Sequence, residues 1–247
     1  MIQDQTYRYG RQLIPNRWGE AEQKKIEKST VFIAGAGGLG TPVAVYLAAA
    51  GVGCLRICDS DIIDLSNLNR QILYTEFDIG KPKVDCLKER LVQLNHFVRV
   101  IPLQRFIKPD SIAELVGDAE IIIDCLDNYQ SRMILNQYSV KNQMPLVHAG
   151  VQGMFGQLTF LYSPETPCMQ CIYSEITDCA SKSVIGAAAG TMGSLQALEV
   201  IKFITGIGQP MMNKMLVWDG ENMAFKEIPL IKKNNCQVCS RTMIPSE

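Results

Sequence analysis

Glycines 35, 37 and 40 follow a run of β-branched and aromatic residues with the spacing G-x-G-x-x-G. In this spacing the chain can turn sharply, approach a phosphate closely and pack a helix against the preceding strand. The N–H groups at the start of that helix then face the anion. Taken alone, such a run is also compatible with an ordinary turn between a strand and a helix. The predicted nucleotide-binding glycines are Gly35, Gly37, Gly38 and Gly40.

A carboxylate follows the next predicted strand. Residues 52–58 have strand composition, and Asp59 comes directly after them, about 20 residues beyond the glycine run. At this place a carboxylate can accept hydrogen bonds from ribose hydroxyls. The combination of the glycine run with Asp59 therefore favours a nucleotide site over an ordinary turn.

Cationic and amide side chains come next along the chain. Residues 60–71 are densely polar, which predicts a loop rather than a core helix. Asn67 can hold a phosphate or ribose oxygen through its amide group, and Arg70 offers a planar guanidinium group to phosphate oxygens. A helical pattern of apolar residues begins after Pro82, which suits a first helical turn, so Lys83 is expected to project from a helix start.

Asp127 follows a nearly continuous apolar run over residues 119–125. Such a run predicts a central parallel strand that is covered on both faces. Because ligands of open α/β sheets bind at the carboxyl ends of the strands, we expect Asp127 on the same rim as Gly38 and Asp59. A carboxylate beside a triphosphate can hold Mg²⁺. The alternative is that Asp127 only caps the helix expected from Tyr129.

Two C-x-x-C pairs indicate a metal site. Four thiolates with this spacing form a tetrahedral zinc site, whereas a redox dithiol would explain one pair but not two. With four cysteine ligands no position is open for substrate, so we expect a structural zinc ion that ties the C-terminal tail to the domain. The predicted ligands are Cys168, Cys171, Cys236 and Cys239.

One further cysteine, Cys179, stands in a polar stretch near Lys182. A lysine can lower the pKa of a thiol and favour nucleophilic attack. An inert surface thiol is the alternative.

His148 lies in a predicted strand and is expected to be structural.

The elements that would position these residues alternate between strand and helix up to residue 150. This alternation predicts an α/β fold with a Rossmann-like, mostly parallel sheet flanked by helices. Beyond it, a strand and a hairpin around Asp219 and Gly220 predict antiparallel C-terminal strands. Helices are expected over 5–28 (divided at Pro15), 110–117, 131–143 and 186–204, and further strands over 97–101, 145–149, 156–162, 214–219 and 222–229.

Bulk composition excludes several classes of partner. The 247 residues carry a formal charge of −1, which argues against a broad basic surface for nucleic acid or anionic membranes. The first residues show no basic-then-apolar signal, and the most apolar stretch, 41–55, is short and interrupted by glycines. We expect a cytoplasmic protein, in which the nine cysteines are not paired as disulfides.

Together these motifs resemble the MoeB/ThiF/HesA group of adenylyltransferases, bacterial relatives of ubiquitin-activating enzymes. The resemblance runs from Tyr7 to Cys239. Besides the glycine run, Asp59 and the two C-x-x-C pairs, it rests on RYGRQ at 8–12, LSNLNRQ at 65–71, GKPK at 80–83, DCLDN at 124–128 and GSLQA at 193–197. It implies one domain over 1–247, with a helical arm over 1–28, a nucleotide-binding core over 29–150 and a carrier-binding, zinc-stapled part over 151–247.

The resemblance also implies a reaction. The C-terminal Gly-Gly carboxylate of a small ubiquitin-like carrier protein attacks the α-phosphate of Mg-ATP and gives an acyl adenylate and pyrophosphate. The enzyme would be a homodimer in which Arg11, otherwise a solvated charge, reaches the triphosphate bound by the partner subunit. Asp59 would hold the ribose and Asp127 the Mg²⁺. The other implied nucleotide-binding residues are Ser66, Asn67, Leu68, Asn69, Arg70, Lys83 and Asn128.

Two departures from the family pattern concern sulfur chemistry. Cys179 matches the cysteine through which some relatives transfer their substrate covalently, but SVIGA at 183–187 replaces the run Gly-Val-x-Gly-Pro common there. No rhodanese domain follows Cys239, so a separate sulfur donor is expected.

Alternative functions stay open beside carrier adenylation for molybdopterin, thiamine or related biosynthesis. Activation of tRNA or a small molecule, as in relatives of tRNA threonylcarbamoyladenosine dehydratase, is a second hypothesis. It is disfavoured because the chain has no excess of basic over acidic residues. An NAD-dependent oxidoreductase is disfavoured by Arg70 and Lys83 and by the lack of an evident acid or base for hydride transfer. A non-catalytic scaffold is the remaining hypothesis.

Overall fold

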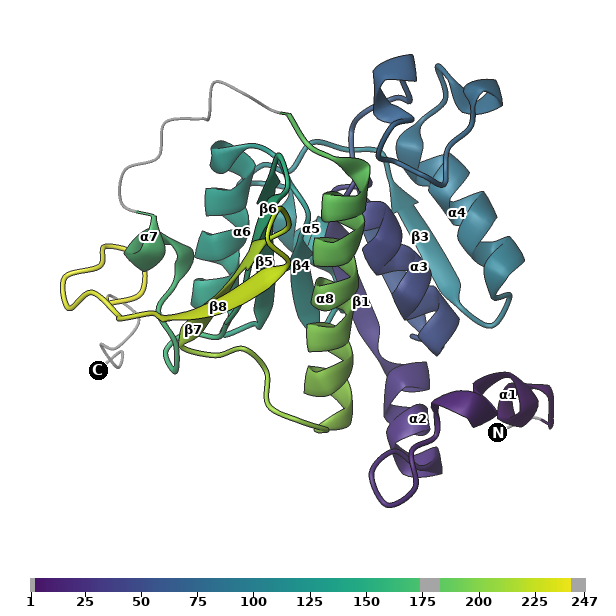
Figure 1. Ribbon diagram of the computed structural model, residues 1–247, viewed down its shortest axis with the longest axis horizontal. Coiled ribbons are helices and arrows are strands. Elements are labelled where there is room, and N and C mark those ends of the chain that lie inside the picture. Colours follow the sequence, from purple (N-terminus) through teal and green to yellow (C-terminus); the bar gives the residue numbers. More distant parts are fainter. Residues whose placement is uncertain (1–2, 174–182, 241–247) are drawn as a thin grey trace.

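The computed structural model describes residues 3–173 and 183–240. Within them eight strands form one sheet in the order β3-β2-β1-β4-β5-β6-β7-β8 (Figure 1). Strands β1 to β5 pair in parallel and β6 to β8 pair antiparallel, as predicted. The strands are β1 Thr30–Ala34, β2 Cys54–Cys58, β3 Arg99–Leu103, β4 Ile121–Asp124, β5 Leu146–Gln152, β6 Phe155–Leu161, β7 Lys214–Asp219 and β8 Ala224–Pro229.

Helices cover the sheet and connect its parallel strands. In the described parts of the chain, no helix combines the length and the apolar character needed to cross a membrane. The helices are α1 Gln3–Tyr9, α2 Glu20–Lys28, α3 Gly40–Ala50, α4 Lys83–Leu94, α5 Ile112–Val116, α6 Tyr129–Lys141, α7 Met169–Ile172 and α8 Gly186–Thr205, with 3-10 turns η1 Gly10–Gln12, η2 Leu65–Asn67 and η3 Glu76–Asp78.

Strand β1 has a hydrophobic cluster on each face. Val31 and Ile33 belong to a cluster that includes residues of α3 and α8, whereas Phe32 and Ala34 belong to a second cluster with residues of α5 and α6. Successive side chains of a strand point to opposite faces, so a strand covered on both faces needs an apolar residue at each position. This packing explains the continuous apolar run before the glycines.

Some elements differ from the sequence predictions. Strand β3 lies two residues later than expected and contains Pro102, which is tolerated because β3 is an edge strand that pairs only with β2 in the sheet. Pro82 is the N-cap residue of α4 rather than part of its first turn. The four-residue helix α7, which starts within the first C-x-x-C pair, was not predicted because it is too short to show a helical period.

The N-terminal arm packs at the C-terminal ends of α3 and α4. Tyr9 is buried; its ring lies against Gly51 at the end of α3, and its hydroxyl accepts a hydrogen bond from Nδ2 of Asn95 at the end of α4, at 2.9 Å. Figure 1 shows α1 and α2 together at one end of the molecule. The arm is therefore about 16 Å, the length of α3, from the glycine run at the start of that helix.

Candidate functional site

The turn between β1 and α3 requires glycine at two positions. Gly35 has a φ of +102°, and a Cβ atom there would lie 2.7 Å from the carbonyl oxygen of Cys125. A Cβ atom on Gly40 would lie 1.9 Å from the carbonyl oxygen of Gly35. These contacts fold the turn tightly against the loop that follows β4. Gly37 and Gly38, at the middle of the turn, are partly exposed, so a ligand can reach their backbone.

Two side chains hold the peptide groups of Ala36 inside this turn. The Asp59 carboxylate accepts a hydrogen bond from the N–H of Ala36 at 2.7 Å and a second from the N–H of Asp61 at 2.8 Å. The buried Tyr74 hydroxyl donates to the carbonyl oxygen of Ala36 at 2.8 Å. A carboxylate has about four lone-pair positions, so Asp59 retains capacity for ribose hydroxyls. Sequence reasoning missed Tyr74, because a single aromatic residue in a polar stretch has no diagnostic spacing.

Arg70 lies beside the glycine turn. A Cβ atom on Gly38 would be 3.4 Å from Cγ of Arg70. The guanidinium group of Arg70 donates from Nη1 to the carbonyl oxygen of Ser66 and to Oδ1 of Asn69, both at 2.9 Å. The structure thus brings the predicted cation and the predicted glycines together. Asn67, Ser66 and Leu68 belong to the same loop, in and after the 3-10 turn η2.

Lys83 is buried at the start of α4, and its Nζ lies 2.9 Å from Oδ2 of Asp61. Asp61 is two residues beyond Asp59, so this pair connects α4 to the loop at the edge of the sheet. Asp61 was not predicted as a site residue. The motif D-x-D at residues 59–61 was visible in the sequence, but nothing in the spacing indicated which lysine it would meet.

Asp127 lies at the same edge of the sheet as the glycine turn. Cys125, whose carbonyl oxygen touches Gly35, precedes it by two residues, and the Asp127 side chain is exposed. Asn128 is the N-cap of α6, because its Oδ1 accepts a hydrogen bond from the N–H of Ser131 at 2.9 Å. The N-cap position of α6 is therefore taken by Asn128 and not by Asp127.

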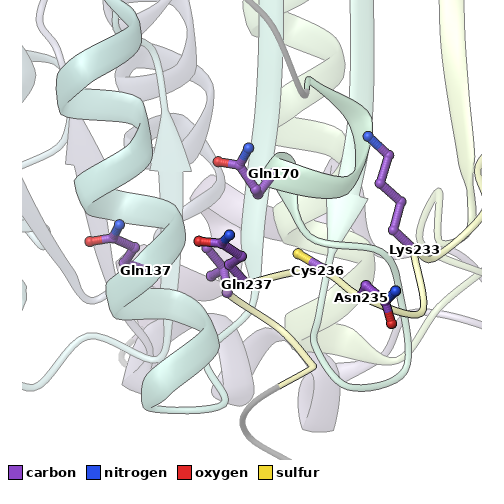
Figure 2. A pocket seen from close by; sticks show the side chains of 7 residues that line it. Gln137, Gln170, Lys233, Asn235, Cys236 and Gln237 are labelled. Carbon is purple, nitrogen blue, oxygen red and sulfur yellow. The ribbon is translucent and has the colours of Figure 1, made fainter.

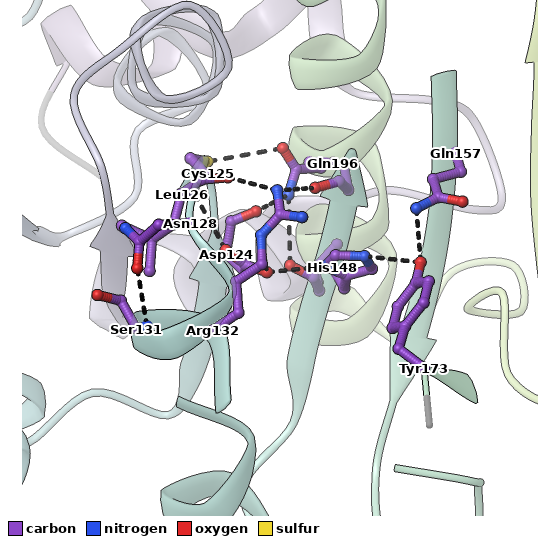
Figure 3. Close-up of polar contacts among 12 residues, drawn as sticks. Asp124, Cys125, Leu126, Asn128, Ser131, Arg132, His148, Gln157, Tyr173 and Gln196 are labelled. Atoms are coloured by element: carbon purple, nitrogen blue, oxygen red, sulfur yellow. Dashed lines mark hydrogen bonds and ion pairs between the residues drawn. The ribbon is translucent and has the colours of Figure 1, made fainter. Parts of the chain in front are cut away.

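A buried polar network lies behind the Asp127 loop (Figure 3). Burial opposes ionisation of Asp124, but the positive charge of Arg132 and a hydrogen bond from His148 hold the pKa of its carboxyl below the usual range. Burial lowers the pKa of His148 despite the Asp124 carboxylate beside it. His148 is fully buried in β5 and has polar partners on both ring nitrogens. Arg132 and its contacts were not predicted.

Two predicted site residues are not part of this assembly. Arg11 is exposed on η1 of the N-terminal arm, at the far end of α3 from the glycine turn. It does not meet the glycine turn of its own chain. Cys179 lies outside the described residues.

The four predicted metal ligands form one buried cluster. Their sulfur atoms all lie within 4.8 Å of one another, and the pairs Cys168–Cys171, Cys168–Cys236 and Cys171–Cys239 are 4.0, 3.7 and 3.5 Å apart. A tetrahedral Zn²⁺ with Zn–S bonds of about 2.3 Å separates its sulfur atoms by about 3.8 Å. The arrangement therefore fits a zinc ion without rearrangement, and the cysteines are free thiols rather than disulfides.

The acidity of these thiols is uneven. Burial raises the pKa of Cys168 to about 11. Burial acts in the same direction on Cys236, but hydrogen bonds from the backbone N–H groups of Cys239 and Val238 outweigh it and lower the pKa to about 7. Four thiolates so close together repel one another, so a cation is needed to deprotonate the set.

A pocket opens beside this cluster (Figure 2). Its lining residue Gln170 belongs to α7, which lies away from α3 and α4 in Figure 1, so this pocket is distinct from the glycine turn. Its lining residues are Gln137, Gln170, Lys233, Asn235, Cys236, Gln237 and Val238.

Comparisons with known proteins agree with this arrangement. A model of the ThiF family matches residues 9–240. Adenylyltransferase and sulfurtransferase MOCS3-1 of Drosophila pseudoobscura pseudoobscura is 37% identical over 254 residues, which cover 100% of this chain and 56% of that protein. Protein HesA, heterocyst, of Trichormus variabilis is 38% identical over 234 residues, which cover 94% of this chain and 88% of that protein. The chain thus spans about half the length of the MOCS3 relatives.

Solved structures share the fold. E. coli MccB crystallised with ATP has a TM-score of 0.78 at 26% identity, over 88% of this chain and 68% of that one. PaaA has a TM-score of 0.80 at 24% identity, over 94% of this chain and 84% of that one. The PaaA likeness concerns the fold alone.

Proposed function

Because the chain belongs to the ThiF family, we propose that it is an adenylyltransferase that activates the C-terminal Gly-Gly carboxylate of a small ubiquitin-like sulfur-carrier protein with ATP. The observation that carries the proposal is the convergence of the glycine turn, Asp59 and Arg70 at one edge of the sheet, with the Asp127 loop packed against Gly35. The relative named MOCS3-1 is an adenylyltransferase and sulfurtransferase by name. Sulfur transfer in molybdopterin, thiamine or related biosynthesis is the proposed setting.

The proposed reaction needs positioning and charge shielding rather than a general base. The carrier carboxylate is already ionised at neutral pH. Its oxygen forms a bond to the α-phosphorus of ATP, and the bond from that phosphorus to the bridging oxygen breaks, so that pyrophosphate leaves with the electron pair. Two anions must approach each other for this step, so groups that stabilise the negative charge on the phosphates lower the barrier.

The chain offers groups of the required kinds. The backbone N–H groups of the glycine turn and the guanidinium of Arg70 can bind phosphate oxygens, as can Lys83. Asp59 would accept hydrogen bonds from the ribose hydroxyls. Asp127 would hold Mg²⁺, which shields phosphate charge when bound and takes most of its other ligands from phosphates and water.

Arg11 would act across a homodimer. The arm that carries Arg11 packs at the far end of α3 from the glycine turn of the same chain, which supports a role at the site of the partner subunit. In the proposed dimer its guanidinium group would complete the set of cations around the triphosphate.

The cysteine cluster would hold a structural Zn²⁺ that fastens residues 236–239 to the segment around α7.

Cys179 would accept the activated acyl group: its sulfur bonds to the carbonyl carbon of the carrier and AMP leaves. A carrier adduct that thiols cleave, formed by the wild type and absent from Cys179→Ser, tests this step.

The test of the proposed function is ATP–pyrophosphate exchange with a panel of Gly-Gly-ended carrier proteins, free amino acids and tRNA. Exchange that depends on one of the carriers is expected. Arg70→Ala should slow it by about 100-fold, the scale for loss of one preorganised electrostatic contact. Arg99→Ala is the control, because Arg99 is exposed at the opposite end of the parallel strands. Exchange with tRNA or amino acids alone, or near wild-type exchange in Arg70→Ala, would contradict the proposal.

A further inference from the structure

The loop that carries Asp127 is held at the residue just before it. Asp124 accepts a hydrogen bond from the N–H of Leu126 at 3.0 Å, and the guanidinium of Arg132 donates to the carbonyl oxygen of Leu126. Asn128 caps α6 immediately after Asp127. The backbone on both sides of Asp127 is therefore fixed, and charged side chains do the fixing on the N-terminal side.

The orientation of the Asp124 carboxylate depends on its other oxygen. Oδ2 lies 2.7 Å from Nδ1 of His148 and forms an ion pair with Nε of Arg132 at 3.4 Å. Arg132 is itself anchored by donation to the carbonyl oxygen of Ala149 at 3.2 Å. The side chains of Asp124 and His148 are both fully buried, so no solvent competes for these contacts.

His148 is held in turn by Tyr173. With its pKa lowered by burial, the imidazole is neutral at neutral pH and carries one N–H. The ionised Asp124 only accepts hydrogen bonds, so this N–H is assigned to Nδ1 and Nε2 is the acceptor. The Tyr173 hydroxyl, 3.1 Å from Nε2, therefore donates to it, and accepts from Nε2 of Gln157 at 2.6 Å. Figure 3 shows this chain of contacts between the β4, β5 and β6 strands.

Stability alone is a poor explanation for such a network. Apolar residues of similar volume often stabilise a core as well as or better than buried ionised groups do. Here the buried charges converge on the residue before the proposed Mg²⁺ ligand. We propose that His148 and Tyr173 are positioning residues for Asp127: they hold the Asp124 carboxylate against Leu126 and thereby set where the Asp127 carboxylate meets Mg²⁺. This inference rests on the proposed function, in which Asp127 holds the ion.

The expected consequence is a change in metal affinity. Partners that orient metal ligands from the outer shell typically change affinity by about 10- to 100-fold when they are removed. His148 acts on Asp127 through Asp124 and Leu126, so its effect should lie at the lower end of this range, about tenfold. Binding of ATP without Mg²⁺ should not change, because none of the predicted phosphate ligands belongs to the network.

Titration calorimetry of ATP, without Mg²⁺ and over a series of Mg²⁺ concentrations, tests the inference on the full chain. The Mg²⁺ concentration that gives half of the metal-dependent gain in ATP affinity should rise about tenfold in His148→Leu and less in Tyr173→Phe. His148→Asn, whose amide keeps a donor near the Nδ1 position, should largely restore the wild-type value. Tyr138→Phe is the matched control, because it also removes one tyrosine hydroxyl and Tyr138 lies in the C-terminal half of α6, away from the Asp127 loop.

Each outcome decides between the two proposals. An unchanged Mg²⁺ dependence in Tyr173→Phe and His148→Leu would overturn the inference alone, as would an equal loss of ATP affinity with and without Mg²⁺. Absence of ATP binding by the wild type would overturn the proposed function and the inference with it. If His148→Leu does not fold, Tyr173→Phe, which removes one oxygen atom, decides.

Discussion

Lys83 and Asp61 are joined twice at the start of α4. The Nζ of Lys83 lies 2.9 Å from Oδ2 of Asp61, and the N–H of Lys83 donates to the carbonyl oxygen of Asp61 at 3.1 Å. The Lys83 side chain is 6% exposed and that of Asp61 is 65% exposed. A nearly buried ammonium group thus has its counter-ion on the solvent side, where phosphates would also approach.

Removing this counter-ion should destabilise the protein. Asp61→Asn leaves the Lys83 ammonium without a charged partner, and we expect a loss of about 1 kcal/mol in the free energy of unfolding, well below the value for a fully buried pair because Asp61 is solvated. Urea unfolding of Asp61→Asn, Lys83→Met and the double variant measures the coupling between the two residues. Additive effects in this cycle would show that the pair contributes nothing.

The Asp59 carboxylate supplies two different acceptor oxygens to the backbone. Asn in its place has one acceptor oxygen, and its amino group would face either the N–H of Ala36 or that of Asp61. We expect Asp59→Asn to raise the KM for ATP by about tenfold or more and to lower kcat less, because ribose binding is common to the ground and transition states. Steady-state exchange kinetics measure both constants. A fall in kcat at unchanged KM would contradict this role.

The sequence predicts elements that have a strong internal period or a defined motif. The strands before Gly35, Asp59 and Asp127 and the two C-x-x-C pairs were found because β-strand composition and fixed spacings are local properties. The antiparallel hairpin at Asp219 was predicted for the same reason. Its existence and partners are confirmed, whereas β3 was placed two residues early because strand composition does not specify where a strand begins and ends.

Contacts between distant single residues were not predictable. Tyr74 contacts Ala36, Asp61 contacts Lys83 and Arg132 contacts Ala149, and each of these pairs meets only because of how the elements pack. No periodicity or motif spacing specifies such pairs. The distance between Arg11 and the glycine turn was not predictable either. The glycine turn lies at the start of α3, whereas the arm that carries Arg11 is held at the end of α3 by the packing of Tyr9 against Gly51.

Removal of the metal should loosen the C-terminal segment. We expect about one Zn²⁺ per chain in protein purified without chelators, and a large fall in melting temperature after its removal, because structural zinc sites contribute directly to folding. Cys236→Ser should lose the ion. Cys54→Ser is the control, because Cys54 is buried in β2 and outside the cluster. Metal analysis and thermal unfolding measure both effects, and full zinc content in Cys236→Ser would contradict the assigned ligand set.

Acid should destabilise the fold through His148. The folded-state pKa of His148 is below that of the unfolded chain, about 6.5, so the unfolded state binds more protons and stability falls as the pH drops below about 6.5. The slope contributed by His148 is at most about 1.4 kcal/mol per pH unit. Asp124, with its pKa also lowered, adds a loss in the more acidic range, as pH falls below about 4.

Substitution of His148 isolates its share of this pH dependence. The charged and titratable groups that face His148 are Asp124 and Arg132, with the Tyr173 hydroxyl on its other side. Unfolding free energies between pH 5 and about pH 7.5 should show a shallower slope in His148→Asn than in the wild type. Equal slopes in the wild type and His148→Asn would contradict the assignment.

Substitution of two glycines by alanine should have opposite effects on stability, because Gly40 lies in the tight turn and Gly190 lies within helix α8. A Cβ atom on Gly40 would lie 1.9 Å from the Gly35 carbonyl oxygen, whereas a Cβ atom on Gly190, within α8, meets no heavy atom within 4 Å. Gly190→Ala should therefore raise the free energy of unfolding by about 0.5 to 1 kcal/mol through helix propensity. Gly40→Ala forces the turn apart and should lower stability by about 2 kcal/mol or more while abolishing ATP binding. Urea unfolding and calorimetry with ATP measure the two effects, and ATP binding of wild-type strength in Gly40→Ala would show that the nucleotide does not use this turn.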